Sequence, residues 1–269
     1  MYKLVALDMD GTLLDNNKTI PEENIRAIKE ASKSGVKIVL ATGRPLVGIK
    51  KYLDILELTS EDNFSIIYNG ALIQNNINKK IISQNLLNYN DLMYFYNLSK
   101  KFDIHMNVFT KDSCISYKSG KYSVLEAKWS NIDIQIVDFN NLDKNIEIAK
   151  IIFADDPELI SKVEDNLGDN IYSKYGIAKS APYFMEFFNR QINKGIAVKK
   201  YADSLNIAKE EIICIGDAGN DIEMIKSAGL GVAMENAFPE IKDIADYTTL
   251  SNEDAGVAHV IDKFILSKL

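Results

Sequence analysis

Residues 4–12 of the chain read Leu-Val-Ala-Leu-Asp-Met-Asp-Gly-Thr. The apolar run 4–7 and the change to Asp8 predict a short buried strand of a parallel sheet that ends in an acidic loop. Asp8 and Asp10 are two residues apart, so both carboxylates can face one point beyond the strand. Gly11 permits a backbone conformation that other residues resist. This stretch therefore predicts an α/β fold with polar groups at a strand end.

Strand and helix signals alternate on both sides of the chain's middle. They follow the first strand up to about residue 80, and they resume near residue 194. This alternation is typical of a doubly wound parallel sheet. The predicted strands are 36–41, 65–68, 211–215 and 230–233, and the predicted helices begin near residues 21, 45, 195, 220, 239 and 254.

The middle of the chain has a different pattern. Residues 82–189 are rich in Asn, Tyr and Phe and carry alternating strand signals, with a helix predicted over 157–167. A domain inserted at a surface loop is well tolerated when its two ends lie close together. The sequence therefore predicts an α+β domain at 82–189, inserted into an α/β core formed by residues 1–81 and 190–269.

Composition excludes several classes of protein. The 269 residues are 46% hydrophobic and 26% charged, which is typical of a globular protein rather than a disordered or disulfide-rich one. The 31 basic and 38 acidic residues give a net charge of −7, which argues against a nucleic-acid partner. Cys114 and Cys214 form no disulfide framework or zinc motif. No segment resembles a signal peptide or a membrane span, so we expect a cytoplasmic location. Oligomeric state is left open.

Three further polar segments lie where a predicted core strand ends or a core helix begins. Thr42-Gly43-Arg44-Pro45 offers a hydroxyl and backbone N–H groups at a helix N-terminus, which can cradle a phosphate. Lys194 begins the helix that re-enters the core. Residues 216–221, Gly-Asp-Ala-Gly-Asn-Asp, offer carboxylate and amide oxygens that suit Mg²⁺. Ligands bind at the carboxyl ends of strands in such sheets, so these segments can converge with Asp8 and Asp10.

Each segment has a simpler interpretation when taken alone. These are a solvated acidic turn, a threonine cap, a surface lysine and an acidic helix cap. Together they make chemical sense, because an Asp carboxylate can attack phosphorus while a neighbouring carboxyl transfers a proton. Four converging carboxylates, from Asp8, Asp10, Asp217 and Asp221, would repel one another. Mg²⁺, Lys194 and a protonated Asp10 would then neutralise the group.

The four segments, DMDGT, ATGRP, NKG and GDAGND, match in order the four motifs of the haloacid dehalogenase superfamily, which the chain resembles over its whole length. The closest resemblance is to the Cof-type phosphatases, whose large cap domain is inserted between the second and third motifs. The resemblance implies a Rossmann-like core, an inserted cap and a Mg²⁺-dependent phosphatase that acts on a small phosphorylated metabolite, most simply a sugar phosphate.

The resemblance also implies a role for each matching residue. Asp8 is the nucleophile that forms an aspartyl-phosphate, and Asp10 is the general acid and base. Asp8, the backbone carbonyl of Asp10, and Asp217 bind Mg²⁺, while Asp221 acts from outside the metal's direct ligands. The catalytic set is completed by Thr42 and Lys194. The phosphoryl oxygens are bound by Thr42, Gly43, Lys194 and Asn220. Arg44 is expected to contact substrate.

Two other functions share these residues. A phosphomutase would use the same aspartyl-phosphate but return the phosphoryl group to substrate rather than to water. A non-catalytic sensor of phosphorylated ligands would need the phosphate cradle but no nucleophile, so Asp8 and Asp10 argue against it. Phe187, Phe188 and Arg190 depart from the small residues of many relatives before the lysine, which affects the expected substrate fit.

Overall fold

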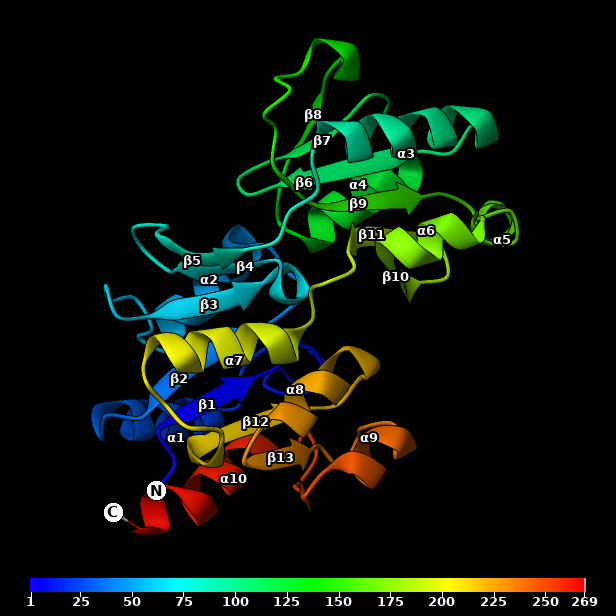
Figure 1. The fold of residues 1–269 in the computed structure, drawn as a ribbon. Coiled ribbons are helices and arrows are strands. Elements are labelled where there is room, and N and C mark those ends of the chain that lie inside the picture. Colours follow the sequence, from blue (N-terminus) through cyan, green and yellow to red (C-terminus); the bar gives the residue numbers. More distant parts are fainter. Residues whose placement is uncertain (269) are drawn as a thin grey trace. The chain divides into compact units, whose positions relative to one another are not determined.

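The computed structural model describes residues 1–268, and the chain divides into two compact units (Figure 1). The first comprises residues 1–84 and those from 193 onward, and the second comprises residues 85–192. The second unit is thus a continuous insertion between two parts of the first. Among the described residues, every helix is too short or too polar to cross a lipid bilayer.

An eight-stranded sheet organises the first unit, in the order β14-β13-β12-β1-β2-β3-β4-β5. The six strands from β14 to β3 pair in parallel, whereas β4 and β5 are antiparallel. Five of the six parallel strands are predicted from the sequence, and the two-residue β14 is not. The short turns after β3 and β4 leave no room for a crossover helix, so this edge departs from the predicted parallel sheet. The strands are β1 (Leu4–Leu7), β2 (Lys37–Ala41), β3 (Phe64–Ile67), β4 (Leu72–Asn75), β5 (Ile81–Gln84), β12 (Ile212–Gly216), β13 (Leu230–Ala233) and β14 (Tyr247–Thr248).

Helices cover both faces of this sheet, which is why β1 is buried at every position (Figure 1). Leu4 and Ala6 of β1 pack with Ala197 and Tyr201 of α7 in one core cluster. Helix α1 packs separately against α10. The helices of the first unit are α1 (Glu22–Lys33), α2 (Leu46–Ile55), α7 (Lys194–Ser204), α8 (Ile222–Ser227), α9 (Pro239–Ile244) and α10 (Gly256–Phe264), and a 3₁₀ turn, η4, spans Gly219–Asp221.

The second unit is an α+β structure around a six-stranded sheet in the order β10-β11-β9-β6-β7-β8. Its main core joins apolar strand residues such as Phe153 and Phe187 to Phe95 of α3. Its elements are α3 (Tyr89–Phe102), β6 (Met106–Thr110), β7 (Cys114–Ser116), α4 (Lys121–Trp129), β8 (Ile134–Ile136), β9 (Ile148–Ala154), α5 (Pro157–Glu164), α6 (Asp169–Lys174), β10 (Tyr175–Ala181) and β11 (Phe184–Asn189).

Helix α4 of this unit lacks the apolar stripe from which a helix is predicted. Helix α4 buries Ser123, Glu126 and Ala127 rather than an apolar stripe. Glu126 and Glu186 both pair with the buried Lys150 of β9, at 3.3 and 3.2 Å. Buried polar partners therefore join α4 to the sheet, beside the contact of the Trp129 ring with Phe184 of β11.

The register of the first sheet brings four strand ends together. Leu4 of β1 lies beside Ile212 of β12 on one side and Lys37 of β2 on the other. Strand β3 pairs in parallel with β2. Because these four strands run in the same direction, the loops that follow them lie at one edge of the sheet. These loops carry Asp8, Thr42, Asn69 and Asp217.

Candidate active site

A buried lysine joins two of these acidic loops. Lys194, the first residue of α7, has no exposed surface and donates hydrogen bonds to Asp8 and to Asp221, the latter at 2.7 Å. Burial opposes its charge, but the two carboxylates outweigh this and raise its pKa. Lys194 is therefore a fixed cation and not the solvated surface charge that a single lysine usually is.

The surroundings of Asp8 and Asp217 oppose ionisation of their carboxyl groups. Burial, followed by the charge of Asp221, raises the pKa of Asp8 well above its usual range, against the opposing effect of Lys194. Burial also raises the pKa of Asp217 to about 6, although Thr12 donates a hydrogen bond of 2.7 Å to its Oδ1. One lysine does not neutralise three carboxylates, so the site has excess negative charge.

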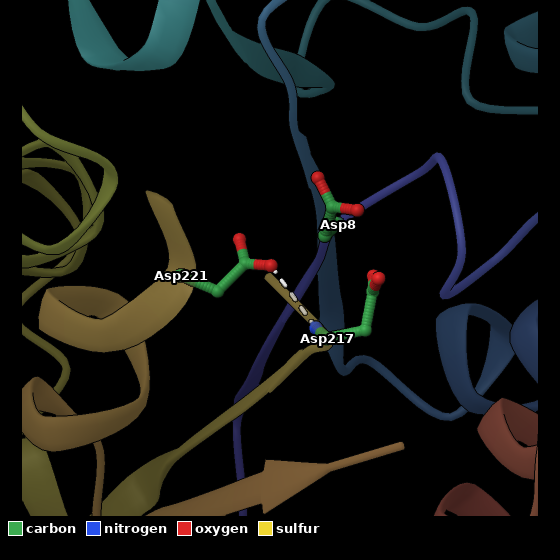
Figure 2. Close-up of side chains that lie close together, drawn as sticks. All are labelled: Asp8, Asp217 and Asp221. Carbon is green, nitrogen blue, oxygen red and sulfur yellow. Dashed lines mark hydrogen bonds between the residues drawn. The ribbon is translucent and has the colours of Figure 1, made fainter. Parts of the chain in front are cut away.

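Asp221 has both carboxylate oxygens occupied. Its Oδ1 accepts the hydrogen bond from Lys194, and its Oδ2 accepts one from the backbone N–H of Ala218 at 3.1 Å. The same Oδ2 accepts another from the backbone N–H of Asp217 at 3.0 Å (Figure 2). Asp221 therefore holds the lysine and folds its own loop, which fits a residue that acts from outside the direct ligands of a metal.

The three carboxylates have the composition and spacing of a divalent-cation site. Asp8, Asp217 and Asp221 each offer an oxygen, and these atoms lie within 4.8 Å of one another (Figure 2). Oxygen-only ligands suit Mg²⁺, and a cation would relieve the repulsion that raises the pKa of Asp8 and Asp217. Gly11 lets the first loop close on this group: its φ is +88°, and a Cβ there would lie 2.4 Å from Oδ2 of Asp217. The site therefore fits Mg²⁺, with Asp8 and Asp217 as the available carboxylate ligands.

Asp10 lies outside that three-carboxylate group and has its own cations. Arg44 donates to both of its oxygens, from Nε to Oδ2 at 2.8 Å and from Nη2 to Oδ1 at 2.6 Å, and Lys18 donates to Oδ1 at 2.9 Å. Burial opposes ionisation of Asp10, but these hydrogen bonds and charges outweigh it and lower its pKa. The expectation that a protonated Asp10 neutralises the site is therefore wrong for this structure, in which Arg44 and Lys18 neutralise Asp10.

The remaining predicted residues lie at neighbouring loops. Thr42 is buried, and its Oγ1 accepts a hydrogen bond from the backbone N–H of Arg44 at 3.2 Å. Asn220 donates from Nδ2 to Oδ1 of Asn69 at 3.1 Å. A Cβ on Gly43 would lie 3.2 Å from the same Asn69 amide, so these loops adjoin.

Sequence reasoning missed three residues that touch this group. The sequence analysis assigns no role to Thr12, Lys18 or Asn69. Asn69 alone had a usable signal, because Asn69-Gly70 follows a predicted strand of the same sheet. Lys18 reaches Asp10 from a loop whose backbone is in the left-handed region, with φ of 60° at Lys18, and spacing does not reveal that.

Comparison with known proteins identifies relatives over the whole chain. A family model described as haloacid dehalogenase-like hydrolase matches residues 5–261. YxeH of Bacillus subtilis (strain 168) is 41% identical over 272 residues, which covers 100% of both chains. The 5-amino-6-(5-phospho-D-ribitylamino)uracil phosphatase YcsE of the same organism is 32% identical over 266 residues, 98% of this chain and 96% of YcsE. A crystal structure of a haloacid dehalogenase-like hydrolase from Bacteroides thetaiotaomicron matches with a TM-score of 0.90 at 30% identity, covering 98% of this chain and 100% of that one.

Replacing Asp217 with Asn is expected to stabilise the metal-free protein at pH 7.5 more than at pH 4.5. The pKa of Asp217 is about 6 in the folded state and about 3.9 in an unfolded chain. The folded state thus binds more protons between these values, and stability falls as the pH rises through that window. The neutral amide avoids this loss. Thermal unfolding of EDTA-treated protein at both pH values measures the effect, with the exposed Asp203→Asn as control. A midpoint below wild type at pH 7.5 would contradict the assignment.

Proposed function

The chain belongs to the family of haloacid dehalogenase-like hydrolases and is a phosphatase of that family, and we propose that it hydrolyses a small phosphorylated metabolite through an aspartyl-phosphate on Asp8, with Mg²⁺ as its metal. One observation carries this proposal. Lys194 engages one carboxylate oxygen of the buried Asp8, and no hydrogen bond within residues 1–268 engages the other. A held carboxylate with one free oxygen is what a nucleophile requires.

The proposed reaction has two steps. Asp8 attacks phosphorus, the ester P–O bond breaks, and a protonated Asp10 gives its proton to the leaving alcohol. Asp10 then takes a proton from water as the water oxygen attacks phosphorus, which releases Asp8 and inorganic phosphate. In the structure Asp10 is held as a carboxylate by Arg44 and Lys18. It must therefore gain a proton and exchange one of these hydrogen bonds before the first step.

Other residues of the site would bind the transferred group. The Thr42 hydroxyl, the Gly43 backbone N–H, Lys194 and Asn220 are the proposed donors to phosphoryl oxygens. Asp8 and Asp217 would hold Mg²⁺, with the backbone carbonyl of Asp10. When bound, the metal neutralises charge on the phosphoryl oxygens, which is the main requirement of phosphoryl transfer.

A polyhydroxylated phosphate ester is the proposed substrate class. The name of YcsE places its phosphate on a ribityl chain, and that relative is 32% identical over nearly the whole chain. A sugar phosphate or sugar-alcohol phosphate presents the same kind of alkyl leaving group. We also propose that the inserted unit, residues 85–192, is the cap domain and that the rest of the chain is the catalytic core.

Asp8→Asn is the decisive test of the nucleophile. The amide is nearly isosteric but is a poor nucleophile, so turnover of p-nitrophenyl phosphate should fall by roughly 10³-fold or more. Steady-state rates and thermal unfolding would be measured together, with Asp203→Asn as the matched control. A folded Asp8→Asn protein that keeps near wild-type turnover would exclude the aspartyl-phosphate mechanism.

Removal of metal should abolish activity. EDTA is expected to stop hydrolysis of p-nitrophenyl phosphate, and Mg²⁺ should restore it while Ca²⁺ does not. Mg²⁺ requires octahedral geometry at about 2.0–2.1 Å, whereas Ca²⁺ takes more ligands at longer distances and would engage both oxygens of Asp8. Dialysed protein assayed in metal-free buffer gives the measurement, and full activity there would rule out the metal.

Asp10 and Arg44 should share a leaving-group signature. An alkyl phosphate needs a proton on its leaving oxygen, whereas p-nitrophenolate leaves without one. Asp10→Asn should therefore lower kcat/KM about 10²–10⁴-fold for an alkyl phosphate and much less for p-nitrophenyl phosphate. Arg44→Met should show the same preference, weaker in size, if Arg44 acts by orienting Asp10.

The double variant separates this role of Arg44 from a direct contact with substrate. When one residue acts only through another, the effects of substituting the two do not add. Asp10→Asn combined with Arg44→Met should thus be no slower on an alkyl phosphate than Asp10→Asn alone. Additive losses would instead support the substrate contact predicted from the sequence.

A further inference from the structure

We infer that Asn69 binds a phosphoryl oxygen of the substrate, an inference that rests on the proposed function and adds a residue to its phosphate site. Asn69 lies in the turn Tyr68–Gly70, directly after β3. The three residues of this turn have φ of 52°, 56° and 102°, all in the left-handed region. Glycine and asparagine tolerate that region but tyrosine rarely adopts it, and residues in such conformations cluster at functional sites.

Backbone hydrogen bonds tie this turn to the proposed phosphate cradle. The N–H of Tyr68 donates to the carbonyl of Arg44 at 3.3 Å, and the N–H of Asn69 donates to the carbonyl of Thr42 at 2.9 Å. The turn is therefore fastened at two points to the loop that carries the hydroxyl of Thr42 and the N–H of Gly43.

The side chain of Asn69 lies between the two loops that are proposed to hold phosphate. Its Oδ1 accepts a hydrogen bond from Nδ2 of Asn220 at 3.1 Å. Both Oδ1 and Nδ2 would lie 3.2 Å from a Cβ on Gly43, so the carboxamide rests against that glycine. Within residues 1–268 no hydrogen-bond acceptor engages the Asn69 Nδ2 group.

This arrangement supplies a neutral donor in an acidic site. The hydrogen bond with Asn220 occupies the Asn69 oxygen and leaves the two N–H groups of Nδ2 for a ligand. A phosphoryl oxygen is the acceptor that suits these donors, because the adjacent Gly43 N–H and Asn220 are proposed to bind the same group. An amide can do this without adding charge to the excess of carboxylates.

Two substitutions at Asn69 separate binding from folding. Asn69→Gly removes the amide but adopts a positive φ readily, so its thermal midpoint should equal or exceed that of wild type. Asn69→Asp keeps the shape but replaces the donor with a carboxylate. Both should weaken the binding of inorganic phosphate about tenfold or more, since a hydrogen bond to a charged group is lost. The Asn69→Asp protein should bind phosphate more weakly than the Asn69→Gly protein, because its carboxylate also repels phosphate.

The measurement is isothermal titration calorimetry of the full chain with inorganic phosphate in the presence of Mg²⁺. Asn206 provides matched controls, since it is exposed in the same unit and has a φ of 56°. Asn206→Gly and Asn206→Asp should bind phosphate as wild type does.

Each outcome decides the inference. Weaker phosphate binding by Asn69→Gly at an unreduced thermal midpoint supports it. A dissociation constant within twofold of wild type, or wild-type protein that binds no phosphate, overturns it. Because the titration needs no turnover, a failed Asp8→Asn test would overturn the proposed mechanism separately.

Discussion

The candidate site depends on one buried ammonium group. Lys194 contacts Asp8, which is 186 residues away in sequence, and Asp221, which is 27 residues away. It stands at the first residue of α7, where the helix dipole disfavours a cation, so the two carboxylates must outweigh both burial and the dipole. Without the lysine, the two buried carboxylates would have no positive charge between them. Lys194 therefore does two things at once: it stabilises the folded loops after β1 and β12, and it fixes the positions of their carboxylates.

The acids of the site are divided by their surroundings into two kinds. Burial and mutual repulsion oppose ionisation of Asp8 and Asp217, whereas Arg44 and Lys18 favour ionisation of Asp10. Carboxyl groups of one type can take different chemical roles when their environments push their pKa values apart. The first pair has the excess negative charge that a metal and a lysine can neutralise. Asp10 is held as a carboxylate by its own cations and must gain a proton before it can act as a general acid.

The positions of strand ends can be predicted from the sequence, whereas the pairing of side chains at those ends cannot. Strand ends could be located, because buried runs such as residues 4–7 change abruptly to polar residues, and parallel strands must place such ends at one edge. Side-chain pairing could not be predicted: the contacts of Lys18 with Asp10 and of Asn69 with Asn220 depend on left-handed backbone that composition does not reveal. Helix α4 was missed because the side chains that it buries are largely polar.

Two features at this edge of the first sheet reduce the stability of the folded chain. One is electrostatic, in the carboxylates of Asp8 and Asp217, and the other is conformational, in the left-handed residues Tyr68 and Asn69. They differ in what can relieve them. A bound cation reduces the repulsion between carboxylates, whereas the cost of the turn lies in its backbone conformation and not in its charge. The excess charge therefore couples cation binding to stability, while the left-handed turn is supported by its backbone hydrogen bonds to the carbonyls of Thr42 and Arg44.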